Sequence, residues 1–257
     1  DSVLIVCNTK KKAKALFECL KKRSEIPVLH LSTNMCQIHR MEVINKVRKM
    51  LKNGEKLILC STQLIEAGVD IDFPVVFREL APLESIIQSA GRCNREGKLD
   101  EGQVYLFQLE DQSQPSRQYE TFAQYAQLCY KGNESRLAGA DFYSEYYTKI
   151  FSLYVEKESI TSKRKQLMFQ DVASLYHIIN SNTISLFIYG YNDESKFLYN
   201  EIKDKEYLSR KDYQRIAQYS VQVVDKSTKK PSNGIKIWFG AYSKDTGLSN
   251  EDEIYYI

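Results

Sequence analysis

The sequence predicts an α/β fold: a parallel β-sheet flanked by helices, followed by a smaller, mainly helical α+β accessory part. Short, continuously apolar runs recur along roughly the first 110 residues, and stretches with helical spacing of apolar residues separate them. Strands that are apolar on both faces are typical of a sheet covered on both sides. Strands that alternate with helices indicate right-handed βαβ units on a parallel sheet.

The elements of the first half follow this alternation in order. Val3–Val6 is the first apolar run, and in the helix after it Ala13, Leu16, Phe17 and Leu20 recur at helical spacing. Strands are expected at 2–7, 27–31, 56–60, 75–77 and 104–107, and helices at 10–22, 35–51 (capped by residues 32–34) and 82–97.

The composition changes near residue 110. Seventeen of the eighteen tyrosines lie at or after Tyr119. The polar run 111–116 indicates a linker, so we predict a first domain at 1–110, a linker at 111–118 and an accessory domain at 119–257. The tyrosines could stack on bases or serve as core residues with hydrated hydroxyls. In the accessory domain, helices are expected around 122–129, 142–155, 169–176, 194–205 and 210–223, and strands at 184–189 and 235–239.

The run 81–97 carries the most chemical information. Pro82 suits the first position of a helix, and Gly97 is a plausible stop. Gln88, Arg92 and Arg95 are spaced i, i+4, i+7, which places them on one edge of that helix. Guanidinium groups form planar, bidentate bonds to phosphate oxygens. The alternative is a solvated helix face whose arginines pair with neighbouring glutamates.

The upstream run STQLIEAGVDIDF (61–73) favours the phosphate-binding interpretation. Together with ELAPLESIIQSAGRCNREG (79–97), it resembles the last two motifs of superfamily 2 helicases. The wording is most similar to that of the CRISPR-associated helicase–nucleases of type I interference systems, over residues 3–109. The resemblance implies a second RecA-like lobe. Many relatives carry Arg where this chain has Ser89, so any contact made by that arginine is in question here.

The resemblance also implies roles for individual residues. Arg92 and Arg95 are expected to act as arginine fingers, with Gln88 beside them, on a nucleotide held by another lobe. Glu66, Gly68 and Asp70 are expected to bind the nucleotide and to form the loop that couples it to nucleic acid. Asp70 is expected on the nucleotide side of this loop, near the ribose or near the two arginines. Gly68 would let that loop turn or approach a ligand closely.

Small hydroxyl and amide residues follow three predicted strands. In parallel sheets, ligands bind beyond the carboxyl ends of the strands. Such groups suit a sugar–phosphate backbone, although helix capping is an equally good explanation for them. The candidates for contact with single-stranded DNA are Asn8, Thr9, Ser32, Thr33, Ser61, Thr62 and Gln63.

Composition restricts the class of protein. The net charge of +3 predicts no global basic surface for nucleic acid. Six cysteines without a Cys-x-x-Cys pair indicate reduced thiols of a cytosolic protein, and three scattered histidines are too few for a metal site. No run is apolar and long enough for a membrane span. A chain that opens with Asp1 and a core strand is expected to be a piece of a longer protein, in the prokaryotic cytosol.

The sequence lacks the parts that would complete a motor. It contains neither a Gly-rich phosphate loop with its lysine, nor an acidic metal-holding motif, nor a histidine–aspartate nuclease cluster. We therefore expect ATP with Mg²⁺ to be bound mainly by an absent first lobe, and the nuclease metal ions by another absent domain. The fragment alone is expected to be inactive. The expected partners are single-stranded DNA, those two domains and a Cascade-like surveillance complex, with no membrane.

Two alternatives remain open at this stage. The chain could belong to a different superfamily 2 DNA helicase of the repair or restart type. It could also be a non-catalytic module whose tyrosine-rich half docks a protein partner. The run 242–248 resembles the C-terminal signature of the CRISPR-associated family.

Overall fold

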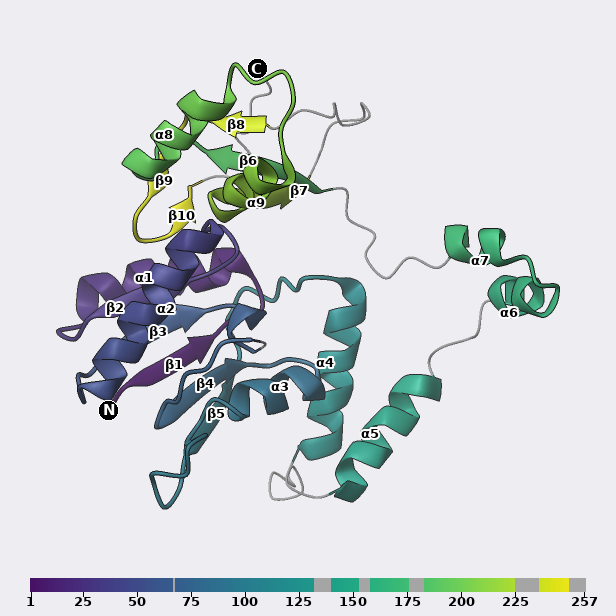
Figure 1. The fold of residues 1–257 in the computed structure, drawn as a ribbon. Helices are drawn as coiled ribbons and strands as arrows, with labels where there is room; N and C mark the ends of the chain where they lie inside the picture. Colours follow the sequence, from purple (N-terminus) through teal and green to yellow (C-terminus); the bar gives the residue numbers. More distant parts are fainter. Residues whose placement is uncertain (67, 132–139, 153–157, 176–182, 225–235, 250–257) are drawn as a thin grey trace.

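The first part of the chain is built on a five-stranded parallel sheet (Figure 1). The computed structural model describes residues 1–66, 68–131, 140–152, 158–175, 183–224 and 236–249. The strand order is β2-β3-β1-β4-β5, and each neighbouring pair is parallel. The strands are β1 (Val3–Val6), β2 (Val28–Leu31), β3 (Ile58–Ser61), β4 (Val75–Glu79) and β5 (Gln103–Phe107). The predicted α/β, RecA-like fold with an accessory part is confirmed.

Three helices and one 3₁₀ turn connect these strands. Helix α2 contributes Ile44, Val47 and Met50 to the main core, together with the apolar residues of β1 and β3. Helix α1 begins after Thr9, whose hydroxyl accepts a hydrogen bond from the Lys12 amide. The elements are α1 (Lys10–Arg23), α2 (Gln37–Lys52), η1 (Gln63–Ile65) and α3 (Leu83–Ala90).

The predicted cap of the second helix is wrong. Helix α2 is preceded by Cys36, and residues 32–34 form a turn in which the Met35 amide donates to the Ser32 carbonyl. Met35 and Cys36 are fully buried. Burying these two side chains fixes the helix start later than the capping residues suggest, because helix position follows packing more than local propensity.

The accessory part combines helices with a small mixed sheet. Its strand order is β7-β6-β8, with β7 antiparallel and β8 parallel to β6. Helices α4 and α5 pack with α3 around buried Tyr146 and Phe142. The elements are α4 (Arg117–Tyr130), α5 (Ala140–Ser152), α6 (Glu158–Lys165), α7 (Phe169–Leu175), β6 (Thr183–Ile188), α8 (Asp193–Ile202), α9 (Arg210–Gln218), β7 (Ser220–Val224), β8 (Lys236–Trp238), β9 (Tyr242–Ser243) and β10 (Gly247–Leu248).

One accessory helix is shorter than the sequence predicts. The apolar pattern suggests a helix over 210–223, but α9 ends at Gln218 and β7 begins at Ser220. Val221 and Val223 point into the core of this sheet and pair with Leu186 and Ile184 of β6. The β-branched residues are therefore used for cross-strand packing. Helix α6 is an element that the sequence does not predict, and residues 153–155 of the predicted helix 142–155 lie outside the described residues.

The predicted linker is bonded to the edge of the large sheet. Lys12 Nζ donates to the Ser113 carbonyl over 2.5 Å, and Asn8 Nδ2 donates to Gln114 Oε1 over 2.9 Å. These bonds hold the segment between β5 and α4 against the start of α1. The domain boundaries at 110 and 118 remain a prediction.

A short hairpin joins the accessory part to the sheet-bearing first part of the chain. Strands β9 and β10 lie beside the start of α2, where the Tyr242 hydroxyl accepts from the Cys36 amide over 3.0 Å. The same hydroxyl lies 2.9 Å from His39 Nδ1, and His39 Nε2 bonds the Lys244 carbonyl. The Leu248 amide donates to the Asn34 carbonyl. The run 242–248 therefore contacts the lobe directly.

All six cysteines are free thiols. Burial raises the pKa of Cys7 and of Cys60 to about 12. Of the helices that the structure describes, none combines the length and the apolar character required to cross a membrane.

The hairpin contact yields a stability prediction at Gly247. This residue has φ +80°, and an added Cβ would lie 2.2 Å from the Asn34 carbonyl oxygen. We expect Gly247→Ala to lower the free energy of unfolding by about 2 kcal/mol, measured by urea unfolding. Gly54→Ala is the matched control, because Gly54 has a similar φ of +71° and a Cβ there meets nothing within 4 Å. Equal effects of the two substitutions would contradict the close approach at Gly247.

Buried His30 yields a pH prediction. Burial, and then the charge of Lys14, lowers the pKa of His30 to about 4. The pKa of His30 is lower in the folded than in the unfolded protein. The free energy of unfolding therefore decreases as the pH falls from 6.5 towards 4, by about 3 kcal/mol in total. His39, whose pKa is also lowered by burial, adds in the same direction. In urea titrations across this range, His30→Gln should flatten the profile, and an unchanged slope would refute the assignment.

Candidate functional site

The helix that carries the arginine motif is shorter than predicted. Helix α3 ends at Ala90 with Gly91 as its C-cap, so Arg92 and Arg95 lie on the loop that follows and Gln88 alone is on the helix. The predicted i, i+4, i+7 edge is therefore wrong. Gln88 is exposed on α3, but it does not share a helical face with the two arginines.

Backbone bonds to the segment before β4 explain this early end. The Phe73 amide donates to the Arg92 carbonyl and the Asn94 amide donates to the Phe73 carbonyl, both over 2.9 Å. These bonds form an isolated parallel bridge between Phe73 and Cys93. Asn94 adopts a positive φ of 46°, which Asn tolerates better than most residues. The backbone groups that would continue the helix are taken by this bridge.

Asp72 fixes the second half of the arginine loop. Its carboxylate accepts hydrogen bonds from the Arg95 amide (2.7 Å) and the Glu96 amide (3.3 Å). Asp72 therefore orients the backbone from which the Arg95 side chain projects. Asp72 is not among the site residues that the sequence motifs predict.

Arg95 is held at the surface by an ion pair. Its guanidinium lies 2.8 Å from Asp70 Oδ1, and the two side chains are 43% and 78% exposed. An ion pair this exposed is weak, so Arg95 can exchange it for another anion at small cost. The structure thus brings together Asp70 and Arg95, which the sequence analysis placed in one site.

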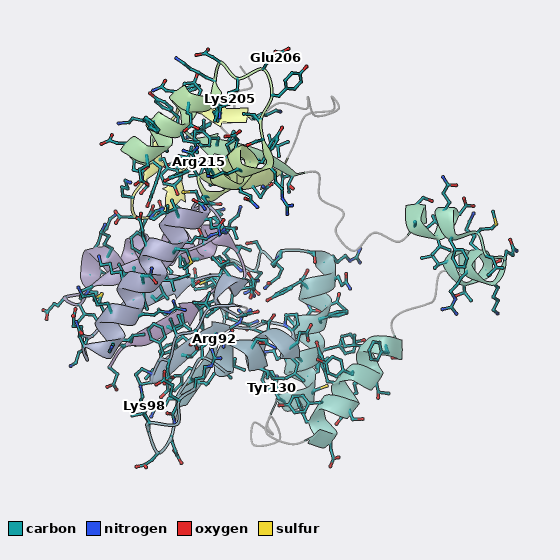
Figure 2. All side chains as sticks on the ribbon, in the orientation of Figure 1. Arg92, Lys98, Tyr130, Lys205, Glu206 and Arg215 are labelled. Carbon is teal, nitrogen blue, oxygen red and sulfur yellow. The ribbon has the colours of Figure 1, made fainter. Side chains whose placement is uncertain are left out.

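Arg92 is bound more firmly, to the loop after β3. Its Nε donates to the Ile65 carbonyl over 2.9 Å and its Nη2 to the Glu66 carbonyl over 2.5 Å. Partial burial, and then the positive charge of Arg95, lowers the pKa of Arg92, while Asp70 and Glu66 raise it. The Arg92 guanidinium is thus fixed to the loop after β3. Figure 2 shows Arg92 on the sheet-bearing part of the chain, with Lys98 further along the same loop.

Glu66 lies beneath this loop as a buried carboxylate. Ser89 Oγ donates to Glu66 Oε1 over 3.1 Å, and Arg78 Nη2 lies 3.1 Å from the same oxygen. Burial raises the pKa of Glu66 and the charge of Arg78 opposes that rise. The carboxylate points inward, so Glu66 supports the loop from within. The Ser89 hydroxyl is therefore engaged in a hydrogen bond inside the protein.

Gly68 provides the turn that the sequence suggests. Its φ of +72° favours glycine, and an added Cβ would meet nothing within 4 Å. The backbone conformation therefore accounts for the glycine without a close ligand.

The strand-end residues are only partly available for binding. They do lie at the carboxyl edge of the sheet, but Asn8, Ser32 and Ser61 are buried. Ser61 Oγ donates to the Leu31 carbonyl, and Ser32 Oγ lies 3.0 Å from His30 Nε2. The structure corrects the expectation that these three side chains face DNA.

The remaining strand-end residues differ from one another. Gln63 Nε2 donates to the Asn8 carbonyl over 2.9 Å, so this amide is also used internally. Thr62 is 5% exposed. Thr9 caps α1 and is half-buried, whereas Thr33 is exposed. Of the predicted set, Thr33 is exposed, and Thr9 and Gln63 are half-buried.

Sequence reasoning missed the charged residues at this same edge. Arg78 is fully buried, and Lys12 forms a buried ion pair of 2.6 Å with Glu79. The one available signal is an arginine in the apolar run VVFRE of β4, where a charge must have partners. The partner Tyr119 lies 41 residues away in sequence, and no local pattern predicts it.

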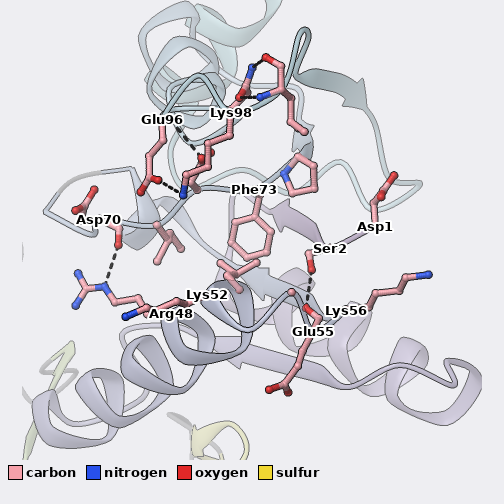
Figure 3. A pocket seen from close by; sticks show the side chains of 17 residues that line it. Asp1, Ser2, Arg48, Lys52, Glu55, Lys56, Asp70, Phe73, Glu96 and Lys98 are labelled. Atoms are coloured by element: carbon pink, nitrogen blue, oxygen red, sulfur yellow. Dashed lines mark hydrogen bonds and ion pairs between the residues drawn. The ribbon is translucent and has the colours of Figure 1, made fainter.

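A cavity of about 680 Å³ lies where the strands begin (Figure 3). Ser2 at the start of β1 and Pro74 before β4 line it. Asp70 and Asp72 also line it, so it adjoins the arginine loop. Among the described residues, no cluster of three histidine, cysteine or carboxylate side chains could hold a metal ion.

The N-terminal part of the chain is similar to a known protein family. The family described as CRISPR-associated nuclease/helicase Cas3, C-terminal, matches residues 1–98. The chain is 38% identical over 103 residues to the CRISPR-associated nuclease/helicase Cas3 of Haloferax volcanii, a match covering 39% of this chain and 11% of that protein. The Cas3 of Methanothermobacter thermautotrophicus is 34% identical over 103 residues, covering 39% and 12%.

Comparison with solved structures extends the likeness in fold. The crystal structure of T. fusca Cas3 with ADP superimposes with a TM-score of 0.57 and 14% identity, covering 87% of this chain and 32% of that one. A chain of a CRISPR RNA-guided surveillance complex before nicking gives a TM-score of 0.53 and 12% identity, covering 86% and 33%. At these identities the likeness concerns the fold alone. The matched stretch of the chain spans about a tenth of the curated relatives' length.

Proposed function

We propose that this chain is the second motor lobe and accessory domain of an ATP-dependent DNA translocase. The reason is that residues 1–98 match the C-terminal region of the Cas3 family. The resemblance predicted from the two motifs is confirmed for this region. The further steps are proposals: the protein moves along single-stranded DNA, unwinds foreign DNA and helps to degrade it in type I CRISPR interference. We place it in the prokaryotic cytosol.

The observation that carries this proposal is the pair of arginines on one loop. Arg95 is exposed and forms a surface ion pair with Asp70, while Arg92 is fixed by two loop carbonyls. Two guanidiniums carried by one short loop fit the negative charge of a nucleotide's phosphates. ATP with Mg²⁺, bound mainly by a first lobe outside this sequence, would supply the transferable phosphoryl group. Arg95 would exchange Asp70 for that group, and Arg92 would hold the loop in register.

The loop after β3 connects this site to the strand-end rim. Residues 62–66 run from the carboxyl end of β3 to the carbonyls that bind Arg92. A change at the arginines therefore reaches the rim through a few residues. We propose that Thr33, Thr9 and backbone groups of this rim contact the single-stranded DNA. The side chains of Asn8, Ser32 and Ser61 are buried and form hydrogen bonds within the protein.

Partners follow from the same family assignment. A relative of similar fold is present in a CRISPR surveillance complex. We propose that this protein is recruited by a Cascade-like complex and that a first lobe and a nuclease domain with its own metal ions belong to the same protein. A repair-type helicase is less well supported, because the matching family and the curated relatives are Cas3 proteins.

Arg95→Ala tests the proposed role in a protein that contains both lobes. Because the side chain is exposed and its ion pair is weak, we expect normal folding and a loss of DNA-stimulated ATP hydrolysis of about 10³-fold. Lys98→Ala on the same loop is the matched control, since its side chain is 72% exposed and pairs only with Glu96. Near-normal turnover of Arg95→Ala would defeat the arginine-finger assignment.

The isolated chain gives a second test. Since its sequence lacks a phosphate-binding loop, the purified 257-residue chain should hydrolyse no ATP above the rate of a blank. The measurement is phosphate release with Mg²⁺ and single-stranded DNA present. Magnesium-dependent turnover by the pure chain would contradict this expectation, and restoration of turnover by adding a first lobe would support it.

A further inference from the structure

The fully buried side chain of Arg78 lies between the arginine site and the accessory part. Its Nη1 donates to Asn8 Oδ1 over 2.7 Å and to the Glu79 carbonyl over 3.0 Å. Its Nη2 lies 3.1 Å from Glu66 Oε1 and donates to the Tyr119 hydroxyl over 2.9 Å. A buried cation needs such partners, and each partner comes from a different segment.

The contact with Glu66 leads directly to Arg92. Arg78 and Ser89 bind the Glu66 carboxylate, which fixes the side chain of that residue. The backbone carbonyls of Ile65 and Glu66 bind the Arg92 guanidinium. The placement of these carbonyls therefore depends on how Glu66 is held.

The contact with Tyr119 leads to helix α4. The Tyr119 hydroxyl accepts from Arg78 and donates to Asn8 Oδ1 over 3.0 Å, and Gln63 Nε2 lies 3.3 Å from it. Tyr119 thus bonds Arg78 of β4, Asn8 beyond the end of β1 and Gln63 in the loop after β3 at once.

We infer that Arg78 is a positioning residue for Arg92: by pairing with Glu66 it sets the two carbonyls that hold the Arg92 guanidinium, and Tyr119 ties that setting to α4. This inference rests on the proposed function, because it assigns Arg92 a part in hydrolysis. Arg78 touches no nucleotide itself. Its effect on turnover passes through Arg92.

The test is a double-mutant cycle in a protein that contains both lobes. Arg78→Lys keeps the positive charge beside Glu66 but loses the planar fork, and Tyr119→Phe removes one hydroxyl from the network. Both are combined with Arg92→Lys, and kcat and KM for ATP are measured with single-stranded DNA. Thermal unfolding reports folding. Tyr125→Phe is the matched control on α4, because that ring packs in the α3–α5 cluster and does not contact Arg78.

We expect each network variant to lower kcat about tenfold with KM for ATP within twofold of the wild type. In the Arg92→Lys background the same substitutions should change kcat by less than twofold, because the residue through which they act is already impaired. Tyr125→Phe should match the wild type in both backgrounds. If Arg78→Lys does not fold, Tyr119→Phe decides.

Two results would overturn the inference. One is a folded Tyr119→Phe protein with wild-type kcat, and the other is a defect that multiplies with that of Arg92→Lys, as an independent structural effect would. Failure of the proposed function has a different signature. In that case Arg92→Ala and Arg95→Ala would themselves retain near-normal turnover, whatever Arg78→Lys does.

Discussion

The parallel bridge between Phe73 and Cys93 is the interaction on which the site depends. By taking the carbonyl of Arg92 and the amide of Asn94, it ends α3 and fixes the arginine loop to the segment that enters β4. Strand β4 is an interior strand of the sheet, so the loop is attached to a rigid part of the core. The sheet therefore positions the arginines, and helix α3 only leads into the loop that carries them.

Buried charge organises the carboxyl edge of the sheet. Arg78 with Glu66, and Lys12 with Glu79, are ion pairs whose side chains are almost wholly shielded from water. Desolvating such groups is costly, and removal of one partner leaves an uncompensated charge. Their partners come from both halves of the chain, including Tyr119 and the Ser113 carbonyl. The same residues thus link the ends of the strands at this edge and bind the segment 113–119, which follows β5.

The accessory part reaches the lobe a second time through the start of α2. Cys36 is a member of the accessory core as well as the residue before α2, and Tyr242 and His39 bond across this contact. Because α2 also supplies the main core, the two cores share one helix. Ten of the fourteen tyrosines that the structure describes pack in or against the accessory core or the α3–α5 cluster, which favours their interpretation as core residues.

The sequence by itself determined the α/β order, the strand positions and the two motifs, because apolar periodicity and motif spacing are local properties. It also placed Asp70 and the two arginines in one site. Tertiary structure alone decided where α3 ends, which strand-end side chains face inward and that β7 replaces the end of a helix. Each of these depends on partners far away in sequence: the Phe73 backbone for Arg92, and Tyr119 for Arg78. Long-range hydrogen bonds and burial outweigh local propensity at these positions.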